Sequence, residues 1–357
     1  MNKEENTRKL LEEHYKKYPK LQVRDIFKFI YQSSFGCEHS VSDLETVKTR
    51  ISEEYSDGCR CVKGEVESLD GDYVRVPLHY IENGLSTETL AKLFFLSAKK
   101  EEDGRVALEE KLQTVKEMVS EGLLPFSGDE LDAAVREWAA QGFPAVRHSE
   151  AFKAEYKPSY RVISKRFAPF LPLFAEIDTR LAKGSLRVAV EGGSASGKST
   201  LGDILLKLYG CTLFHMDDFF LRPEQRTAER FSEAGGNIDR ERFLAEVLVP
   251  MSRGDTVTYR KFDCSKMDLG EAVREEPKAL TVTEGAYSMH PDLAGYYNFS
   301  VFLDISEETQ RARIEKRNSP AMAKRFFEEW IPMEKRYFKE MRIPENCDMI
   351  IKINKKS

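Results

Sequence analysis

Residues 192–200 read Gly192-Gly193-Ser194-Ala195-Ser196-Gly197-Lys198-Ser199-Thr200 and fit the pattern G-x-x-x-x-G-K-[ST]. A short apolar run at 186–190 precedes them, and an apolar helical pattern at 201–208 follows. Small residues let the backbone fold tightly, so that its N–H groups point inward at an anion, and the positive end of the following helix adds to the attraction. The stretch therefore predicts a phosphate-binding loop between a strand and a helix.

The side chains of this loop suit a nucleoside triphosphate with its magnesium ion. Lys198 can reach the β- and γ-phosphates, and the hydroxyl of Ser199 can ligate Mg²⁺. We therefore expect ATP and Mg²⁺ as cofactors, with the whole of 192–200 in contact with the nucleotide. Loops of this kind serve small-molecule kinases, GTPases and motor or transporter ATPases alike. The reaction must be inferred from the rest of the chain.

The sequence around the loop predicts an α/β fold. Short strand-like runs alternate with helical patterns, which indicates right-handed βαβ units in a parallel sheet covered on both faces. The predicted strands are 186–190, 211–215, 280–283, 300–303 and 349–353, and the predicted helices are 201–208, 240–249 and 307–316. The fold class is therefore the doubly wound parallel sheet of a P-loop NTPase, with its site at the carboxyl ends of the strands.

The chain is long enough, at 357 residues, for two domains. Its first part is mostly helical in pattern, with predicted helices at 21–31, 86–100 and 130–140 and one short strand at 73–80. Ser127, followed three residues later by Glu130, has the spacing of a helix N-cap. We expect residues 1–170 to form a mostly helical domain of unknown role and residues 171–357 to form the P-loop domain.

Composition narrows the class of protein. A formal net charge of −5 argues against a general nucleic-acid binder or a basic membrane-surface protein. No apolar run is long enough to span a bilayer, and the first residues lack the apolar core of a secretory signal. The six cysteines are scattered, with no C-x-x-C pair, which favours reduced thiols and a cytoplasmic location. The sequence does not indicate the oligomeric state.

Residues 191–200, EGGSASGKST, resemble the phosphate loop of the uridine kinases, which belong with the phosphoribulokinases and type I pantothenate kinases. A second segment, 215–220, resembles the Asp-Ser-Phe-Tyr segment of the same family, and the resemblance covers about residues 185–355. By the family pattern Asp217 would be the general base. Chemistry agrees, because a carboxylate at the carboxyl end of a strand, facing the phosphate loop, can accept the proton of an attacking hydroxyl.

The resemblance also implies acidic groups near the metal. Residues 281–285 resemble the family's strand that ends in Glu-Gly, so Glu284 would assist Mg²⁺, through water. Asp218 would either support Mg²⁺ or cap the next segment. Phe220 stands where the family carries a tyrosine, in the part of the segment that faces the acceptor.

The match is weaker where the family reads its acceptor. Asp239 inherits the role of an aspartate that contacts substrate hydroxyls, but a helix N-cap explains it equally well because 240–249 is a predicted helix. Tyr259 and Lys261 lie where uridine kinases carry a Tyr-Asp-Phe segment followed by a base-reading histidine. Between Tyr259 and Pro291 the only histidine is His290. Nucleobase recognition is therefore open, whereas phosphoryl transfer is not affected.

Three arginines lie on the predicted helix 307–316 or just after it: Arg311, Arg313 and Arg317. The family places a mobile, arginine-rich lid over ATP at this point. Arg313 and Arg317 would then neutralise charge on the transferring phosphoryl group, and Arg311 would contact ATP. The alternative is a solvated charged helix face.

The N-terminal part has its own polar residues. His39, His148, Glu150 and Arg161 either line a polar pocket for a second ligand or cap helices and satisfy backbone groups at loop ends. Neither H-x-x-x-H nor H-E-x-x-H occurs, so we expect no zinc site.

Together these features predict an ATP- and Mg²⁺-dependent kinase that transfers the γ-phosphoryl group to a hydroxyl of a small molecule. A nucleoside such as uridine or cytidine is the leading acceptor. The alternatives are another polyol, a sugar or a vitamin precursor, or an ATP-dependent regulatory or binding module. We expect no nucleic-acid or membrane partner.

Overall fold

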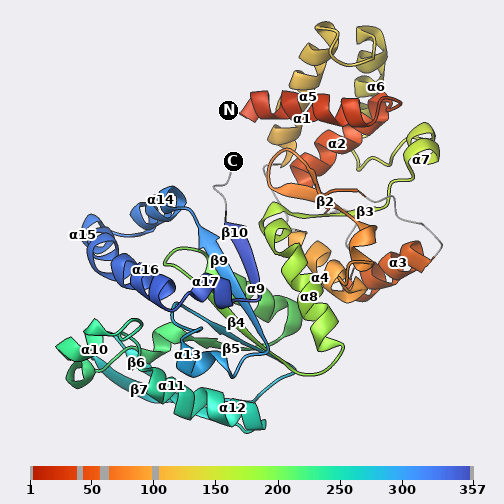
Figure 1. The fold of residues 1–357 in the computed structure, drawn as a ribbon. Helices are drawn as coiled ribbons and strands as arrows, with labels where there is room; N and C mark the ends of the chain where they lie inside the picture. Colours follow the sequence, from red (N-terminus) through yellow and green to blue (C-terminus); the bar gives the residue numbers. More distant parts are fainter. Residues whose placement is uncertain (1–2, 38–42, 57–63, 99–103, 354–357) are drawn as a thin grey trace. The chain divides into compact units, whose positions relative to one another are not determined.

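The computed structural model describes residues 3–37, 43–56, 64–98 and 104–353. The chain forms two compact units, Met1–Asp178 and Thr179–Ser357 (Figure 1). The division falls within helix α8 (Leu171–Leu181). Within the described residues, no helix is both long and apolar enough to cross a membrane.

The N-terminal unit is mostly helical, as predicted. Its helices are α1 (Lys3–Lys17), α2 (Val23–Phe35), α3 (Leu44–Ser56), α4 (Thr87–Ser97), α5 (Gly104–Ser120), α6 (Gly128–Ala140) and α7 (Glu150–Tyr156), followed by α8. A small antiparallel sheet accompanies them, with β1 (Glu67–Ser68), β2 (Tyr73–Pro77) and β3 (Tyr160–Ser164) in that order. The predicted strand at 73–80 is shorter than expected, because a 3₁₀ turn takes over at Leu78–Ile81. The other two strands were not predicted.

Two helix starts in this unit follow directly from the sequence. Ser127 caps α6 by accepting a hydrogen bond from the backbone N–H of Glu130 at 3.1 Å, as predicted. Ser86 caps α4 in the same way by accepting from the N–H of Thr89 at 3.0 Å. A short polar side chain at this position satisfies a helix N–H that has no partner within the helix.

Asp25 of α2 accepts four hydrogen bonds inside the N-terminal unit. Its carboxylate is fully buried. It accepts hydrogen bonds from the N–H groups of Gln22 and Ser149 at 3.0 Å each, from the Ser149 hydroxyl at 2.6 Å and from His148 Nδ1 at 2.9 Å. Burial alone would raise the pKa of Asp25, but the hydrogen bonds from His148 and its other donors outweigh it and lower the pKa to about 2. Asp25 thereby fixes α2 to the start of α7.

The C-terminal unit is built on a five-stranded sheet in the order β10-β9-β4-β8-β5, and every pairing in it is parallel. The strands are β4 (Leu186–Gly192), β5 (Thr212–His215), β8 (Leu280–Glu284), β9 (Phe299–Ile305) and β10 (Met349–Ile353), so all five predicted strands are confirmed. The chain runs from central β4 to edge strand β5, and β8 later fills the place between them. It then continues on the other side of β4 with β9 and β10. The loop after β4 therefore lies where the strand order reverses, which is where ligands bind in open α/β sheets.

Helices cover both faces of this sheet. On one face α9 (Lys198–Tyr209) packs on β4, β5 and β8. On the other, Ala189, Phe214 and Phe302 share a hydrophobic core with Phe243 and Tyr337. The remaining helices are α10 (Ala228–Ser232), α11 (Arg240–Phe243), α12 (Val249–Arg253), α13 (Pro291–Ala294), α14 (Glu307–Arg317), α15 (Pro320–Arg325), α16 (Ile331–Glu340) and α17 (Ile343–Asn346). The doubly wound P-loop NTPase fold is confirmed.

Two features of this unit were not predicted. The predicted helix at 240–249 is present, but a π-helical segment, Leu244–Leu248, joins α11 to α12 within it. A two-stranded antiparallel hairpin follows, formed by β6 (Val257–Asp263) and β7 (Asp268–Glu275) (Figure 1). The hairpin carries both Tyr259 and Lys261, so their positions follow from strand alternation.

We expect Asp25→Ala to destabilise the N-terminal unit by about 3 kcal/mol, because two backbone N–H groups and His148 lose a buried acceptor. The chain has two tryptophans, Trp138 and Trp330, one in each unit. Urea unfolding followed by fluorescence in a Trp330→Phe background therefore reports on the N-terminal unit alone. Because the folded pKa of Asp25 lies below that of a free aspartate, its contribution is present above about pH 4 and disappears as the pH falls through about 2. Asp132→Ala, at an exposed position of α6, is the control, and an equal loss in both variants would contradict this role.

Candidate active site

The phosphate loop connects β4 to α9 and adopts the backbone conformation expected for it. Gly192 has φ +151°, and a Cβ there would lie 2.8 Å from the carbonyl oxygen of Leu303. Gly197, at the N-cap of α9, has φ +104°, and Ala195 also has a positive φ of +60°. Only glycine adopts the conformations of Gly192 and Gly197 without strain. The loop therefore wraps closely at the positive end of α9.

Lys198 and Ser199 occupy the first turn of α9. Lys198 Nζ turns back over the loop and donates to the carbonyl oxygens of Gly192 at 2.8 Å and Gly193 at 3.0 Å. Ser199 and Thr200 are exposed. Lys198 and Ser199 thus lie at the start of α9, directly after the loop.

Glu191, the last side chain before the loop, is completely buried. Its carboxylate accepts from three backbone N–H groups, those of Gly192 at 2.9 Å, Tyr287 at 3.2 Å and Met289 at 3.1 Å. The hydroxyls of Ser288 and Tyr337 donate to it at 3.4 and 3.1 Å. Burial raises the pKa of Glu191, and the backbone hydrogen bonds oppose that shift. Glu191 is the first residue of the segment 191–200, but the sequence did not predict a role for it.

The ends of β5 and β8 bring acidic groups to the same edge of the sheet. His215 and Glu284 are register partners in these neighbouring strands, and His215 Nδ1 lies 2.6 Å from Glu284 Oε1. The Glu284 carboxylate raises the pKa of His215, which favours the protonated ring. Glu284 thus meets its predicted position at the strand end, and it has a histidine partner that was not predicted.

Asp217 follows His215 in a short 3₁₀ turn, Met216–Phe219. The residue is exposed to solvent, yet protein atoms crowd its carboxyl group, and this burial raises the pKa of Asp217. Lys198 lowers that pKa and Glu284 raises it, so the loop lysine and the β8 glutamate both act on Asp217. Asp218, in contrast, is half-buried and forms an ion pair with Lys261 of β6 at 3.0 Å.

Three predicted acceptor residues take other positions. Asp239 is buried and caps α11 by accepting from the N–H of Arg242 at 3.2 Å, while Gln225 Nε2 donates to its other oxygen at 3.0 Å. The N-cap alternative is thus confirmed. Tyr259 is 3% exposed, and its ring stacks on Phe219 at 5.4 Å, inside the core. Phe220 is half-buried and packs against the same core.

The structure separates the three arginines of the predicted lid. Arg313 Nη1 donates to the carbonyl oxygens of Ala195 at 3.0 Å and Ser196 at 3.3 Å, so it lies on the phosphate loop. Arg311 is exposed and lies over the ring of Phe327 at 4.2 Å, and Arg317 is exposed over Phe326 at 5.7 Å. Of the three, only Arg313 touches the loop in this structure.

Two further residues hold the loop from the same side and were not predicted. Glu334 of α16 accepts from the backbone N–H of Ser194 at 2.9 Å and from its hydroxyl at 2.6 Å. Gln310 of α14 donates to the carbonyl oxygen of Ser194 at 2.9 Å. Burial raises the pKa of Glu334, and Lys198 opposes that shift. The loop amide therefore binds an anionic oxygen in this structure.

These residues fit a nucleotide with Mg²⁺. The buried hydroxyl of Ser196 has no hydrogen-bond partner among the described residues, and it lies beside Gly192, where a Cβ would approach it to 3.0 Å. The described part of the chain has no group of three or more His, Cys, Asp or Glu residues able to hold a metal by themselves. Mg²⁺ in phosphoryl-transfer sites needs only one or two protein ligands beside phosphate and water, and Ser199 and Glu284 can supply them.

No family model and no curated protein sequence matches this chain. Solved structures of kinases are similar to about half of it. A possible uridine kinase from Bacillus stearothermophilus is 18% identical, with a TM-score of 0.39, over 50% of this chain and 98% of that one. A D-glycerate 3-kinase from Cryptococcus neoformans is 16% identical, with a TM-score of 0.35, over 43% of this chain and 83% of that one. Both scores are below 0.5, so the function must be inferred from the site.

We expect Glu191→Ala to lower the free energy of unfolding of the C-terminal unit by about 3 kcal/mol, because three backbone N–H groups lose their acceptor. The amides of Tyr287 and Met289 should then exchange with deuterium faster, as measured by mass spectrometry of peptides covering 285–290. Glu271→Ala, at an exposed site of β7, is the control and should change neither quantity. Unchanged exchange at 285–290 in Glu191→Ala would show that Glu191 does not organise this segment.

Proposed function

We propose that the C-terminal unit is an ATP- and Mg²⁺-dependent kinase that transfers the γ-phosphoryl group to a hydroxyl of a small molecule. The observation that carries this proposal is the position of Asp217. It lies at the same sheet edge as the phosphate loop, with β8 between its strand and β4, so the two strands are about 10 Å apart. An ATP-driven switch has no need for a base beside its loop, whereas a kinase that acts on an alcohol does.

Each group of the site has a role in this reaction. The backbone of 192–200 holds the phosphates, and Lys198 and Arg313 neutralise the charge that develops on the transferring group. Ser199 and Glu284 would hold Mg²⁺, the latter through water, with His215 orienting the Glu284 carboxylate. When bound, Mg²⁺ would supply positive charge that neutralises the phosphates of the nucleotide.

Asp217 takes the proton of the acceptor hydroxyl while the hydroxyl oxygen bonds to the γ-phosphorus and the bond to ADP breaks. Its raised pKa suits this role, because a stronger base holds the proton better than an ordinary carboxylate does. The charge of Lys198 opposes that rise and so favours the ionised form that accepts the proton.

The leading acceptor is a nucleoside such as uridine or cytidine, with another polyol, sugar or vitamin precursor as the alternative. Support for a nucleobase pocket is weak. Tyr259 is inside the core, Asp239 is an N-cap, and Lys261 is paired with Asp218. Of the predicted acceptor residues, Phe220 and the Asp218–Lys261 pair lie on the segments next to Asp217. They suit a hydroxylated acceptor of either kind.

The test is consumption of Mg·ATP against a panel of nucleosides, sugars and other small alcohols. One acceptor should be phosphorylated, and Asp217→Asn should lower kcat/KM by about a hundredfold or more. Because the base must be ionised, kcat/KM of the wild type should fall as the pH drops through a value above the ordinary aspartate pKa of about 4, and the variant should lack this dependence. Asp255→Asn, at an exposed turn, is the control. ATP binding without any phosphorylated acceptor would instead favour an ATP-dependent regulatory module.

The two arginines four residues apart on α14 give a matched comparison. Arg313→Gln should lower kcat/KM by about a hundredfold, because it removes the cation that lies on the phosphate loop. Arg317→Gln should change it by no more than about threefold, because that side chain is exposed beside Phe326. Steady-state kinetics with the identified acceptor measures both. Equal losses in the two variants would show that α14 moves during turnover and brings Arg317 to the site.

A further inference from the structure

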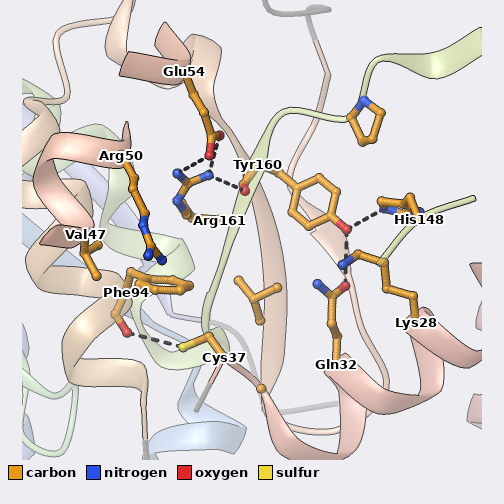
Figure 2. A pocket seen from close by; sticks show the side chains of 13 residues that line it. Lys28, Gln32, Cys37, Val47, Arg50, Glu54, Phe94, His148, Tyr160 and Arg161 are labelled. Carbon is orange, nitrogen blue, oxygen red and sulfur yellow. Dashed lines mark hydrogen bonds and ion pairs between the residues drawn. The ribbon is translucent and has the colours of Figure 1, made fainter. Parts of the chain in front are cut away.

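The N-terminal unit contains a pocket of about 290 Å³ that the proposed kinase reaction does not use (Figure 2). Helices α2, α3 and α4, strand β3 and the segments that flank α7 supply its lining. Among the lining residues are Lys28, Arg50, Glu54, Phe94, Tyr160 and Arg161. The pocket therefore brings together residues that are far apart in the sequence of this unit.

The charges of this lining are mostly positive. Arg161 is neutralised by Glu54 in a two-pronged pair, with Nη1–Oε2 and Nη2–Oε1 distances of 2.8 and 2.9 Å. Arg50 and Lys28 form no ion pair with any residue in the described parts of the chain. Glu54 is the one carboxylate among the described lining residues, so two positive charges remain in excess. The whole chain has a net charge of −5, which makes this local excess more notable.

Lys28 is half-buried, and within the described parts of the chain its ammonium group donates one hydrogen bond, to the carbonyl oxygen of Val146 at 3.1 Å. Burial lowers the pKa of Lys28 to about 8, so the group is still largely charged at neutral pH. A buried ammonium group normally has an anionic partner, because removing it from water is costly. The nearest acid on its helix, Asp25, is already occupied by four donors.

The wall beside Lys28 is rigid and neutral. The Tyr160 hydroxyl lies 2.7 Å from His148 Nε2 and 3.3 Å from Gln32 Oε1, and His148 Nδ1 contacts Asp25. Burial lowers the pKa of His148 to about 4, so the ring is uncharged at neutral pH. Figure 2 shows Lys28, Gln32 and His148 on one side of Tyr160 and Arg161 with Glu54 on the other. This network holds polar groups in place around the opening without filling it.

Of the four polar residues that the sequence grouped here, His148 and Arg161 line the pocket. Glu150 is exposed and pairs with Lys153 at 2.7 Å, away from the lining. His39 lies outside the described residues. Apolar side chains complete the lining, and the described ones are Val47, Phe94, Pro158 and Val162.

We infer that this pocket binds a small organic molecule through its phosphate or carboxylate group, with Arg50 and Lys28 as the recognising cations and Phe94 beside its apolar part. An arginine with no acidic partner offers a planar pair of donors that matches either group. Glu54 restrains Arg161 and weakens the positive field of the pocket. The inference is independent of the kinase proposal, because it concerns binding within the N-terminal unit alone.

Calorimetric titration of the full chain tests this with three probes that share a phenyl ring: phenyl phosphate, benzoate and neutral benzyl alcohol. All proteins carry Lys198→Met, which removes the charged anion-binding side chain of the phosphate loop. We expect at least one anion to bind and benzyl alcohol not to. Arg50→Gln should lower the affinity for the anion by about tenfold or more, which is the usual effect of losing one charge-assisted contact. Arg136→Gln, at an exposed site of α6, should leave the affinity unchanged.

Glu54→Gln provides a test of opposite sign. It removes the carboxylate of the pocket and frees Arg161, so the anion should bind more tightly, whereas damage to the fold would weaken binding. Tighter binding of phenyl phosphate assigns a phosphate ester, and tighter binding of benzoate assigns a carboxylate. The inference is overturned if neither anion binds at millimolar concentration, if benzyl alcohol binds as well as benzoate, if Arg50→Gln behaves like Arg136→Gln, or if Glu54→Gln weakens binding.

Discussion

The buried carboxylate of Glu191 is the interaction on which the C-terminal site depends. It joins the end of the central strand β4 to the segment that follows β8, and through the Tyr337 hydroxyl to α16. A carboxylate surrounded by five donors is costly to leave unpaired, so none of these segments can move away alone without a large loss of free energy. The phosphate loop starts at the next residue. The hydrogen bonds of Glu191 therefore fix the position of the loop relative to β8, and hence to Glu284, without the help of a ligand.

A second set of contacts approaches the loop from above and differs in kind. From α14, Arg313 donates two hydrogen bonds to loop carbonyl oxygens and Gln310 donates one, and Glu334 of α16 accepts two from Ser194. A substrate phosphate, which accepts hydrogen bonds, can replace Glu334 at the Ser194 N–H, whereas the carbonyl oxygens bound by Gln310 and Arg313 need a donor. The loop is thus held rigidly on the side of Glu191, whereas its contact with Glu334 can be exchanged for one with the nucleotide. That combination suits a reaction in which a nucleotide must enter, be shielded from water and leave.

The fold could be predicted from the sequence far better than the site. The five strands and the phosphate loop follow from local patterns, because strand composition and a glycine-rich turn are properties of neighbouring residues. Glu334 meets Ser194 across 140 positions of sequence, so no local pattern points to it. The same reason applies to Arg313: its spacing from Arg317 on α14 shows that they share a face, but only the position of α14 shows which one lies on the loop. Tyr259 was misplaced because the β6–β7 hairpin, and with it the alternation that turns its ring into the core, was not predicted.

Net charge gives little guidance to the ligands of such a chain. The sum of −5 is spread over the whole surface, while charges interact strongly only within about 8 Å at physiological ionic strength. Within that range the phosphate loop presents Lys198, Arg313 and the end of α9, and the pocket of the N-terminal unit presents Arg50 and Lys28. An acidic protein can therefore contain two sites that attract anions, provided that positive charge or N–H groups outnumber carboxylates at each of them. The two sites differ in how they hold that excess: backbone N–H groups, which cannot titrate, dominate in the phosphate loop, whereas side chains dominate in the pocket. A single substitution can therefore reduce the charge excess of the pocket directly, whereas in the phosphate loop the backbone N–H groups remain after any one side chain is replaced.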